Sequence, residues 1–578
     1  MTAWIPAGGV LAEVVRLAAG ILLLVASWAG WGYWAGLLTM RGHEEKPVRF
    51  FDHAVAGAAA LFVLATVLNQ FTALEPWAGD ASTAAGLAGC ALLFKRRRAA
   101  GEPTGLPALT GLLGALYLAA GTRCISLHYD SGLYHLPFIE WLHAGALPLG
   151  LANLHVRFGY FSSWLVLGGL EGSSRFPPDL LYSMNAAAAV VVLGALLETA
   201  TPALRSGQWR FSSLFSVASV VLLGAAADPL FFTWMGASPS PDVPAALLAL
   251  LAFARLSEFL ERGRGAGEGL LSTGLLAAAM AVTVKPSQAP VLAAAAGTAL
   301  WARARLRPWG EGGLLRQAGA AAVLLAIWEA GGLIVSGCLL FPVAGSCPAA
   351  VPWSIDPAQA AAEAGRVAAW ARAPGPMFRE VQQGWQWLPY WRELMWPNRP
   401  VLLHVLVAGG GMLLVAALFR SMAGKGRMEP GERRAFAVVM ATSLITVAAT
   451  ALTAPDPRFC LAFLIALPSA GTAWMLAGPA HRSRHRRAVA GAALALLAAV
   501  ALVNLWMTPR CGECCAWRRL PSPSTEVRTT RTGLAIQVPR GTDQCWLTPP
   551  PCSPDFRPSV SEAEYFGRRA FVAARPAR

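Results

Sequence analysis

Charged residues are scarce in this sequence, and their scarcity excludes an ordinary soluble protein. Only 14% of the 578 residues are charged, whereas 55% are hydrophobic. A soluble protein of this size carries about 25% charged residues and about 45–50% apolar ones. The sequence also has no repeat of fixed period and no low-complexity linker, so a repeat array is not expected.

Acidic residues are fewer than basic ones, 32 against 47, and the formal net charge is +15. Such an excess is found in nucleic-acid-binding proteins, but here the basic residues cluster beside the ends of apolar segments. The positive-inside rule of membrane proteins produces that placement. We therefore expect membrane lipid and no nucleic acid as a partner. A cleavable signal peptide is not recognisable, because Arg16 comes late and no small-residue cleavage site follows.

The hydrophobic residues fall in unbroken blocks of about 17–25 residues, the length of helix that crosses a bilayer. Unbroken runs indicate helices, since the strands of a membrane barrel alternate. We predict an all-α polytopic membrane protein with about 14 transmembrane helices. The predicted spans are residues 15–38, 53–73, 80–94, 106–122, 179–199, 211–228, 243–256, 268–284, 287–302, 316–337, 400–419, 434–453, 459–477 and 488–507.

Seven short connections are basic, and all of them lie on one side if the spans alternate. By the positive-inside rule that side is the cytoplasm. The other side receives the long segments 123–178 and 339–400, the tail 508–578 and both termini. The seven basic connections hold Arg41, Lys46 and Arg49; Lys95, Arg96, Arg97 and Arg98; Arg205 and Arg210; Arg255, Arg262 and Arg264; Arg303, Arg305 and Arg307; Arg420, Lys425, Arg427, Arg433 and Arg434; and Arg482, Arg484, Arg486 and Arg487.

Most cysteines fall in the segments assigned to the outside, where an oxidising compartment makes them disulfide candidates. Zinc binding by Cys511-x-x-Cys514 and free thiols are the alternatives, although no second close pair completes a metal site. The candidates are Cys338 and Cys347 beside a short outer segment, and Cys511, Cys514, Cys515, Cys545 and Cys552 in the tail.

The first long outer segment carries an acid next to a predicted span, in His128-Tyr-Asp130. A carboxylate near the membrane surface is costly without a role or a partner. Asp130 is a candidate general base whose pKa a membrane interface can raise toward the working pH. The alternative is a helix N-cap before the amphipathic run 133–142. His128, Asp130 and His135 could also gather a divalent metal, while Tyr134 and Trp141 suit the membrane interface.

Three further charged residues stand at predicted outer helix ends. Asp242 follows Ser-Pro-Ser-Pro where a helix re-enters the membrane, so it is a second acid or an N-cap. Lys285 and Arg458 break the positive-inside trend. Capture of a phosphate would explain them; snorkelling, or a local Arg458–Asp456 pair, would explain them without a ligand. Tryptophans in 339–400 fit sugar stacking or, more simply, membrane anchoring.

These motifs resemble the GT-C superfamily of membrane glycosyltransferases, which use polyprenyl-phosphate sugars. The likeness covers residues 110–510, behind extra N-terminal membrane helices within 1–105, with a GT-C-like core over 106–507. It looks closest to uncharacterised bacterial members. The motifs are His128-Tyr-Asp130, Tyr134-His135, Ser-Pro-Asp242, Val-Lys285-Pro-Ser, Pro-Asp-Pro-Arg458-Phe, Gly150-Leu-Ala-Asn-Leu-His155 and Val351-Pro-Trp-Ser354.

The resemblance implies an inverting sugar transfer on the outer face of a bacterial cytoplasmic (inner) membrane. Asp130 would deprotonate or orient the acceptor hydroxyl or amine, with His128, His135 and Asp242 as acceptor or metal candidates. Lys285 and Arg458 would hold the phosphate of the lipid carrier. A divalent metal is an open cofactor. The sequence has no glycine-rich nucleotide loop after a strand, which suits a lipid donor. The competing hypotheses are a transporter or flippase of a lipid-linked or anionic substrate, and an assembly subunit with a degenerate site.

Overall fold

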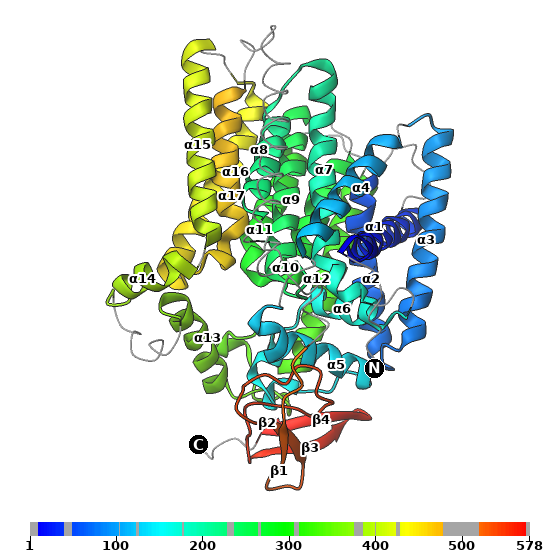
Figure 1. Cartoon of the computed structure of the whole chain (residues 1–578), viewed down its shortest axis with the longest axis vertical. Coiled ribbons are helices and arrows are strands. Elements are labelled where there is room, and N and C mark those ends of the chain that lie inside the picture. Colours follow the sequence, from blue (N-terminus) through cyan, green and yellow to red (C-terminus); the bar gives the residue numbers. More distant parts are fainter. Residues whose placement is uncertain are drawn as a thin grey trace.

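A computed structural model describes most of the chain, and it shows a helical bundle with a small β-rich tail (Figure 1). The described residues are 10–39, 49–102, 104–122, 127–175, 179–227, 230, 236–263, 268–305, 311–374, 385–398, 400–423, 428–477 and 520–573.

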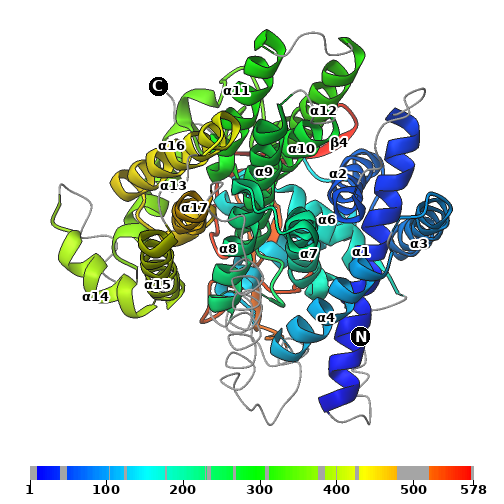
Figure 2. The same ribbon diagram turned by 90° about the horizontal axis from the view of Figure 1, so that it is seen from above.

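The first four helices form a group at one side of the molecule. They are α1 (Val10–Thr39), α2 (Phe50–Asn69), α3 (Pro76–Ala99) and α4 (Gly105–Thr122). Figure 1 views α1 nearly end-on and Figure 2 views it from the side, so α1 crosses the bundle instead of running along it. Glycines permit the crossing: a Cβ on Gly30 would lie 1.7 Å from the Gly86 carbonyl oxygen, and one on Gly57 equally close to that of Trp28.

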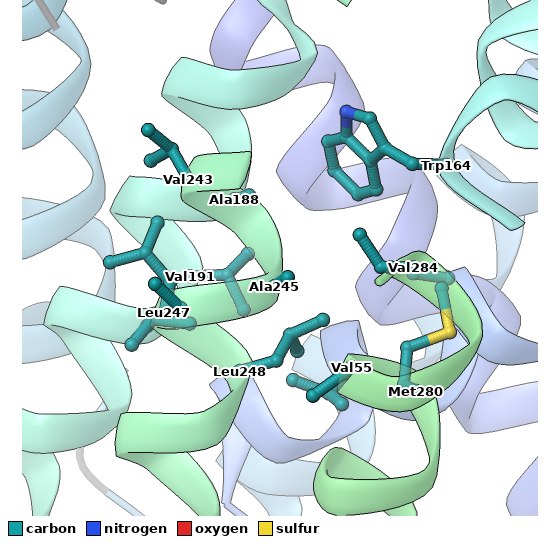
Figure 3. Packing of buried hydrophobic residues seen from close by; sticks show 14 of the residues in the cluster. Val55, Trp164, Ala188, Val191, Val243, Ala245, Leu247, Leu248, Met280 and Val284 are labelled. Atoms are coloured by element: carbon teal, nitrogen blue, oxygen red, sulfur yellow. The ribbon is translucent and has the colours of Figure 1, made fainter. Parts of the chain in front are cut away.

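The main bundle surrounds α9 (Asp242–Arg262), and the apolar part of this helix is wholly buried. Figure 3 shows Val243, Leu247 and Leu248 of α9 among side chains of α2, α7 (Met184–Ser206), α10 (Glu268–Val284) and α6 (Ser163–Ser173). Burial on every side requires a helix that is apolar all round, as the sequence of α9 is over its first turns. Its neighbours are α7, α8 (Phe211–Ala225), α10, α11 (Ala289–Arg305), α16 (Pro430–Thr453) and α17 (Pro457–Leu476). Outside these, α12 (Glu311–Ser336) packs on α10, and α15 (Pro400–Ala423) packs on α17 and α8.

The structure bears out a helical membrane protein in its coarse form. The first thirteen predicted spans coincide with α1–α4, α7–α12 and α15–α17. Among the described residues, 8 helices are long and apolar enough to cross a membrane, and α4, α8 and α10 contain shorter apolar stretches. Helices α3 and α11 meet neither description. The predicted span 488–507 lies outside the described residues.

The segment predicted as the first outer loop is folded and largely buried. It contains the π-helical turn η1 (Ser131–His135), α5 (Leu136–Ala144), the short 3-10 turns η2 (Leu151–Asn153) and η3 (Val156–Gly159), and α6 (Ser163–Ser173). Trp141 is buried against Phe571, with ring centroids 5.6 Å apart, so its assignment to a membrane interface is wrong. The sequence analysis did not predict α6, which is shorter than a membrane span.

The other long outer segment also forms helices, and both segments lie at one end of the molecule. This segment contains α13 (Pro357–Arg372) and α14 (Leu388–Asn398). Figure 1 shows α5, α13, α14 and the strands together at the lower end, beneath α7, α15 and α16. The segments that the sequence assigned to one side of the membrane are therefore neighbours in space.

The tail corrects the all-α prediction, because it forms two antiparallel hairpins. Strand β1 (Thr525–Thr529) pairs with β2 (Ala535–Pro539), and β3 (Val560–Tyr565) pairs with β4 (Arg568–Ala573). Phe566 and Gly567 both have positive φ, as a two-residue hairpin turn requires. Disulfides join Cys338 to Cys347 and Cys545 to Cys552. Cys511, Cys514 and Cys515 lie outside the described residues.

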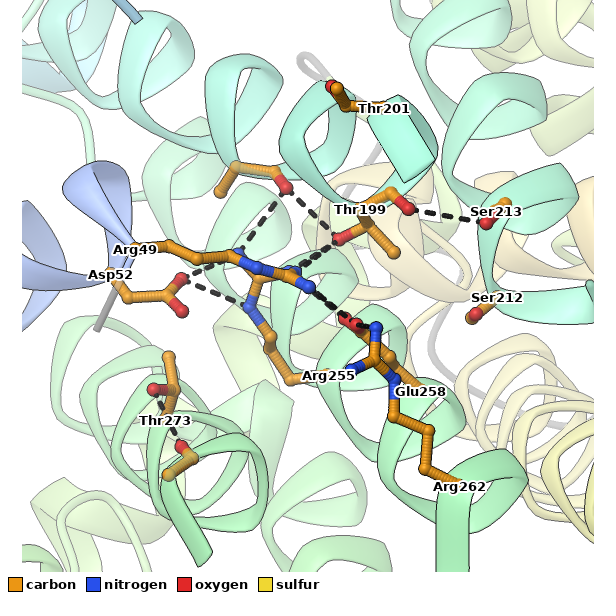
Figure 4. Close-up of polar contacts among 12 residues, drawn as sticks. Arg49, Asp52, Thr199, Thr201, Ser212, Ser213, Arg255, Glu258, Arg262 and Thr273 are labelled. Atoms are coloured by element: carbon orange, nitrogen blue, oxygen red, sulfur yellow. Dashed lines mark hydrogen bonds and ion pairs between the residues drawn. The ribbon is translucent and has the colours of Figure 1, made fainter. Parts of the chain in front are cut away.

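A buried ionic network joins α2, α7 and α9 far from the tail (Figure 4). Arg255 is fully buried and its Nη2 lies 2.6 Å from Asp52 Oδ1. Glu258 accepts a hydrogen bond of 2.8 Å from Arg49 and lies 2.6 Å from Arg262. The sequence analysis placed Arg255 in a basic loop, which is wrong because α9 continues to Arg262 and turns Arg255 toward α2.

Candidate functional site

One cavity collects the four charged residues that the sequence singled out. Asp130, Asp242, Lys285 and Arg458 all line it, and it encloses about 1080 Å³ including its open mouth. Each residue stands at the end of a different helix: before η1, at the start of α9, after α10 and at the start of α17. Helices α12 and α13 complete the wall through Trp328, Glu329, Val367, Trp370 and neighbouring residues.

Asp130 and Asp242 are held by cations and not by helix-capping hydrogen bonds. Asp130 occupies the N-cap position of η1, but its side chain makes no capping hydrogen bond. Its Oδ2 lies 3.6 Å from His128 Nδ1 and 3.6 Å from Arg458 Nη1. Asp242 is the first residue inside α9, after the N-cap Pro241, and forms an ion pair with Lys285. The N-cap alternative therefore accounts for neither acid.

Arg458 is aimed at both acids by a third carboxylate. Asp456 caps α17 by accepting from the Arg458 backbone N–H at 3.0 Å, and it also accepts from Arg458 Nε at 2.9 Å. This bond fixes the guanidinium so that Nη1 reaches 3.6 Å from Asp130 and 3.8 Å from Asp242. The local Arg458–Asp456 pair, which was the alternative to phosphate binding, is therefore present. It orients the Arg458 side chain into the cavity.

Lys285 owes its place to the break between α10 and α11. Pro286 begins the short turn η7 (Pro286–Gln288), because proline cannot continue the preceding helix. Lys285 Nζ lies 4.6 Å from the centre of the Phe459 ring, and the Arg458 guanidinium lies 5.7 Å from the centre of the same ring. The aromatic face therefore stabilises two cations at neighbouring positions.

The charge state of Asp130 follows from these neighbours. Burial alone would raise the pKa of Asp130, but the charges of His128 and Arg458 outweigh it and hold the pKa below its ordinary value. From the sequence, a membrane interface was expected to raise this pKa, and the direction is opposite because His128 and Arg458 lie beside the carboxylate. Asp130 is accordingly ionised at neutral pH.

His135 faces the same cavity in a neutral state. Burial lowers its pKa to about 4, so the ring carries no charge at neutral pH. Only 1% of His135 is exposed, and neither ring nitrogen has a hydrogen-bond partner among the described residues. Unpaired buried nitrogens are costly unless a ligand completes them. His135 is the cavity residue that most clearly lacks its partner.

The structure adds cavity residues that the sequence analysis did not select. Arg157, Tyr160 and Ser240 line the cavity, and Tyr134, assigned from sequence to the membrane interface, lines it too. Arg157 Nε lies 2.9 Å from the buried carboxylate of Glu363, and this ion pair joins η3 to α13. Arg157 lies between Val156 and Phe158, and a charge between two large apolar residues is the signal that could have found it.

The described side chains of the cavity do not form a set of ligands suited to a metal ion. No group of three or more His, Cys, Asp or Glu suited to a metal ion occurs among the residues that the structure describes. His128 and Asp130 are neighbours, whereas Asp242 faces Lys285. The negative charge of both acids is already met by cations of the protein.

A family model for DUF8201, described as a domain of unknown function, matches residues 16–465. The chain belongs to the DUF8201 family. No curated protein matches the chain in a sequence search. The region matched to DUF8201 contains Asp130, Asp242, Lys285 and Arg458 and ends before the β-rich tail.

Proposed function

We propose that this DUF8201 protein is a membrane glycosyltransferase of the GT-C type. It would move a sugar from a polyprenyl-phosphate carrier to an acceptor hydroxyl or amine, on the outer face of the bacterial cytoplasmic membrane. The observation that carries the proposal is the convergence of Asp130, Asp242, Lys285 and Arg458 on one cavity. Four segments far apart in the sequence supply these residues, so their meeting is not a consequence of local sequence.

In the proposed reaction, one bond forms and one breaks at the sugar's anomeric carbon. The acceptor oxygen or nitrogen attacks that carbon as its proton passes to Asp130, and the bond from the carbon to the phosphate oxygen breaks with its electron pair. The departing polyprenyl phosphate takes the added negative charge. Lys285 and Arg458 would stabilise that charge, as phosphate oxygens accept well from both cations.

The ion pairs of the cavity suggest how charge is managed before a donor binds. Lys285 pairs with Asp242, and Arg458 lies between Asp130 and Asp242. An arriving phosphate would share these cations, while Asp456 keeps the guanidinium in place. Arg458 would then interact less strongly with Asp130, and the pKa of Asp130 would rise, which makes it a better base. His135 would supply a neutral hydrogen-bond partner to the acceptor.

A divalent metal is not required by this scheme, and the donor set does not favour one. Asp130 and Asp242 each face a protein cation at ion-pair distance. We therefore derive no step through a metal.

The transporter hypothesis is less well supported by the same geometry. A transport path must reach both ends of the bundle, whereas the cavity is lined by the beginnings of α9 and α17 and by segments at that same end. Further along, α9 is buried and Phe253 meets Phe463 with ring centroids 6.0 Å apart. Among the described residues, the packing of α9 against α17 below the cavity therefore favours a site that opens at one end.

The test is Asp130→Asn in the purified full-length protein, supplied with a panel of polyprenyl-phosphate sugars. We expect release of polyprenyl phosphate to fall about 10²–10⁴-fold, the usual contribution of a general base. Asp356→Asn is the matched control, since Asp356 caps α13 outside the cavity and Asn caps equally well. Near-normal turnover by Asp130→Asn would remove Asp130 from the mechanism, and Asp242 would be the next acid to test.

A further inference from the structure

We propose that the C-terminal tail is a working part of the site, with Trp546 as the positioning residue for Asp130. The catalytic meaning of this role rests on the proposed function, whereas the contact itself does not. No tail residue among those described lines the cavity. The tail would therefore act through the segment that carries Asp130.

Trp546 packs directly on the chain two residues after Asp130. Its backbone N–H donates to the Gly132 carbonyl oxygen at 2.9 Å. A Cβ on Gly132 would lie 2.4 Å from Cε2 of the Trp546 ring. The ring thus occupies the space that any other residue at position 132 would need. Only 7% of Trp546 is exposed, so this contact is buried.

Residues before Trp546 hold the chain on the other side of Asp130. Gln544 Nε2 donates to the Tyr129 carbonyl oxygen at 2.7 Å, and the Tyr129 hydroxyl donates to Asp543. Position 130 is consequently held from both sides by one short stretch of the tail. Trp546 itself has φ of +50°, a conformation that bulky residues rarely adopt, and the Cys545–Cys552 disulfide closes the loop around it.

The tail is anchored well enough to act as a support. Leu149 donates to the Arg569 carbonyl oxygen at 2.9 Å and accepts from Phe571 at 2.8 Å. Asn153 Nδ2 donates to the carbonyl oxygens of Phe571 and Trp353, each at 2.9 Å, so one amide joins tail and core. The motifs Gly150–His155 and Val351–Ser354, quoted for the family resemblance, meet at this junction.

Hydrogen exchange in the full-length protein tests the contact without any substrate. With Trp546→Ala we expect the amides of residues 129–135 to exchange about tenfold faster, because the segment opens locally once its packing partner is lost. Exchange in α9 should not change. Leu547→Ala is the matched control, since Leu547 is the next residue in the same loop and is exposed. Trp546→Phe should restore most of the protection.

The reciprocal change comes from the other side of the contact. Gly132→Ala should also speed exchange at 129–135, because its Cβ displaces the ring. In the Trp546→Ala background the same change should add almost nothing, since the space is then free. Two changes that act on one contact are non-additive. Additive effects, or unchanged exchange in Trp546→Ala, would overturn the proposal.

Turnover assays then separate this proposal from the proposed function. With a polyprenyl-phosphate sugar as donor, Trp546→Ala should lower kcat at least tenfold and leave the donor KM nearly unchanged, because Lys285 and Arg458 are untouched. Trp546→Phe should recover most of kcat. Altered exchange without any sugar transfer by the wild-type protein would refute the glycosyltransferase and keep the tail contact. Transfer with normal kcat in Trp546→Ala would refute the positioning role alone.

Discussion

At the scale of single residues, the cavity is organised by the position of one guanidinium. Arg458 is oriented by Asp456 and lies within 4 Å of Asp130 and Asp242. His128 and Arg458 together lower the pKa of Asp130 and keep it ionised in the free protein. In the proposed reaction Arg458 also binds the incoming phosphate, so it would link the charge state of the proposed base to the presence of the donor.

This link predicts the pH dependence of turnover. A carboxylate whose pKa is lowered stays charged until the pH falls below the ordinary value of about 3.9. The wild-type rate should therefore not fall through protonation of Asp130 between pH 7 and pH 5. Arg458→Gln leaves His128 in place but removes one of the positive charges that oppose the effect of burial, so the pKa of Asp130 rises. The acid limb of kcat/KM should then move to higher pH.

The measurement is kcat/KM for the donor from pH 4.5 to 8 in both proteins, because this ratio reports the charge state of the free protein. Arg528→Gln in the tail is the control, because Arg528 pairs with Glu526 outside the cavity. A profile in Arg458→Gln that stays as flat down to pH 4.5 as that of the wild type would show that Arg458 does not set the charge state of Asp130.

At the scale of secondary-structure elements, a second ionic cluster fastens the helices that carry the site. Arg255 and Asp52 pair α9 with α2 in full burial, and Arg49 reaches Glu258 across the same interface (Figure 4). Because α9 also begins with Asp242, its axial position sets where that acid meets Lys285. The cluster therefore fixes the register of α9 from the end opposite to the cavity.

Arg255→Met should destabilise the protein by about 3–5 kcal/mol, because Asp52 is left buried without a partner. The double change Asp52→Leu with Arg255→Met should recover much of that loss, since no unpaired charge remains. Thermal unfolding of detergent-solubilised protein measures both. Arg262→Met is the control, as Arg262 is partly exposed and Glu258 keeps Arg49. A double variant as unstable as Arg255→Met would contradict this account.

Element positions follow from sequence where a segment is long and apolar, and less well elsewhere. Thirteen predicted spans coincide with helices because unbroken apolar runs of that length have few alternatives. The short helix α6 and the hairpins of the tail were missed, since their apolar residues are too few to stand out. The turn at Phe566-Gly567 gave no clear signal either, because a bulky residue rarely takes the positive φ that Phe566 adopts.

For the candidate site, the sequence identified the individual residues but could not show which of them are paired. Asp130, Asp242, Lys285 and Arg458 were selected because each is a charge at a helix end in an apolar sequence. Their pairing with one another depends on distances between helices, which no local pattern contains. Burial of Arg255 and the contact of Trp546 with Gly132 likewise join segments more than 200 residues apart.

At the scale of the whole molecule, the placement of the site depends on which end of the bundle faces outward. The described parts of the segments that the sequence assigned to the outside gather at the end that holds the cavity, the strands and the two described disulfides (Figure 1). The short basic connections that are described, such as the one at Arg205 and Arg210, belong to the other side of the predicted alternation. From the positive-inside rule we predict that this other side is cytoplasmic.

Impermeant maleimide labelling of intact cells tests this orientation. A cysteine introduced at Ala350, exposed beside α13, should react from outside, whereas one at Ser206, exposed at the end of α7, should react only after the membrane is permeabilised. The unaltered chain gives the background of its own cysteines, of which Cys90 and Cys460 are buried. Reaction at Ser206 in intact cells without reaction at Ala350 would put the cavity in the cytoplasm. A flipped lipid-linked sugar would not be presented there, so that result would refute the proposed donor as well as the orientation.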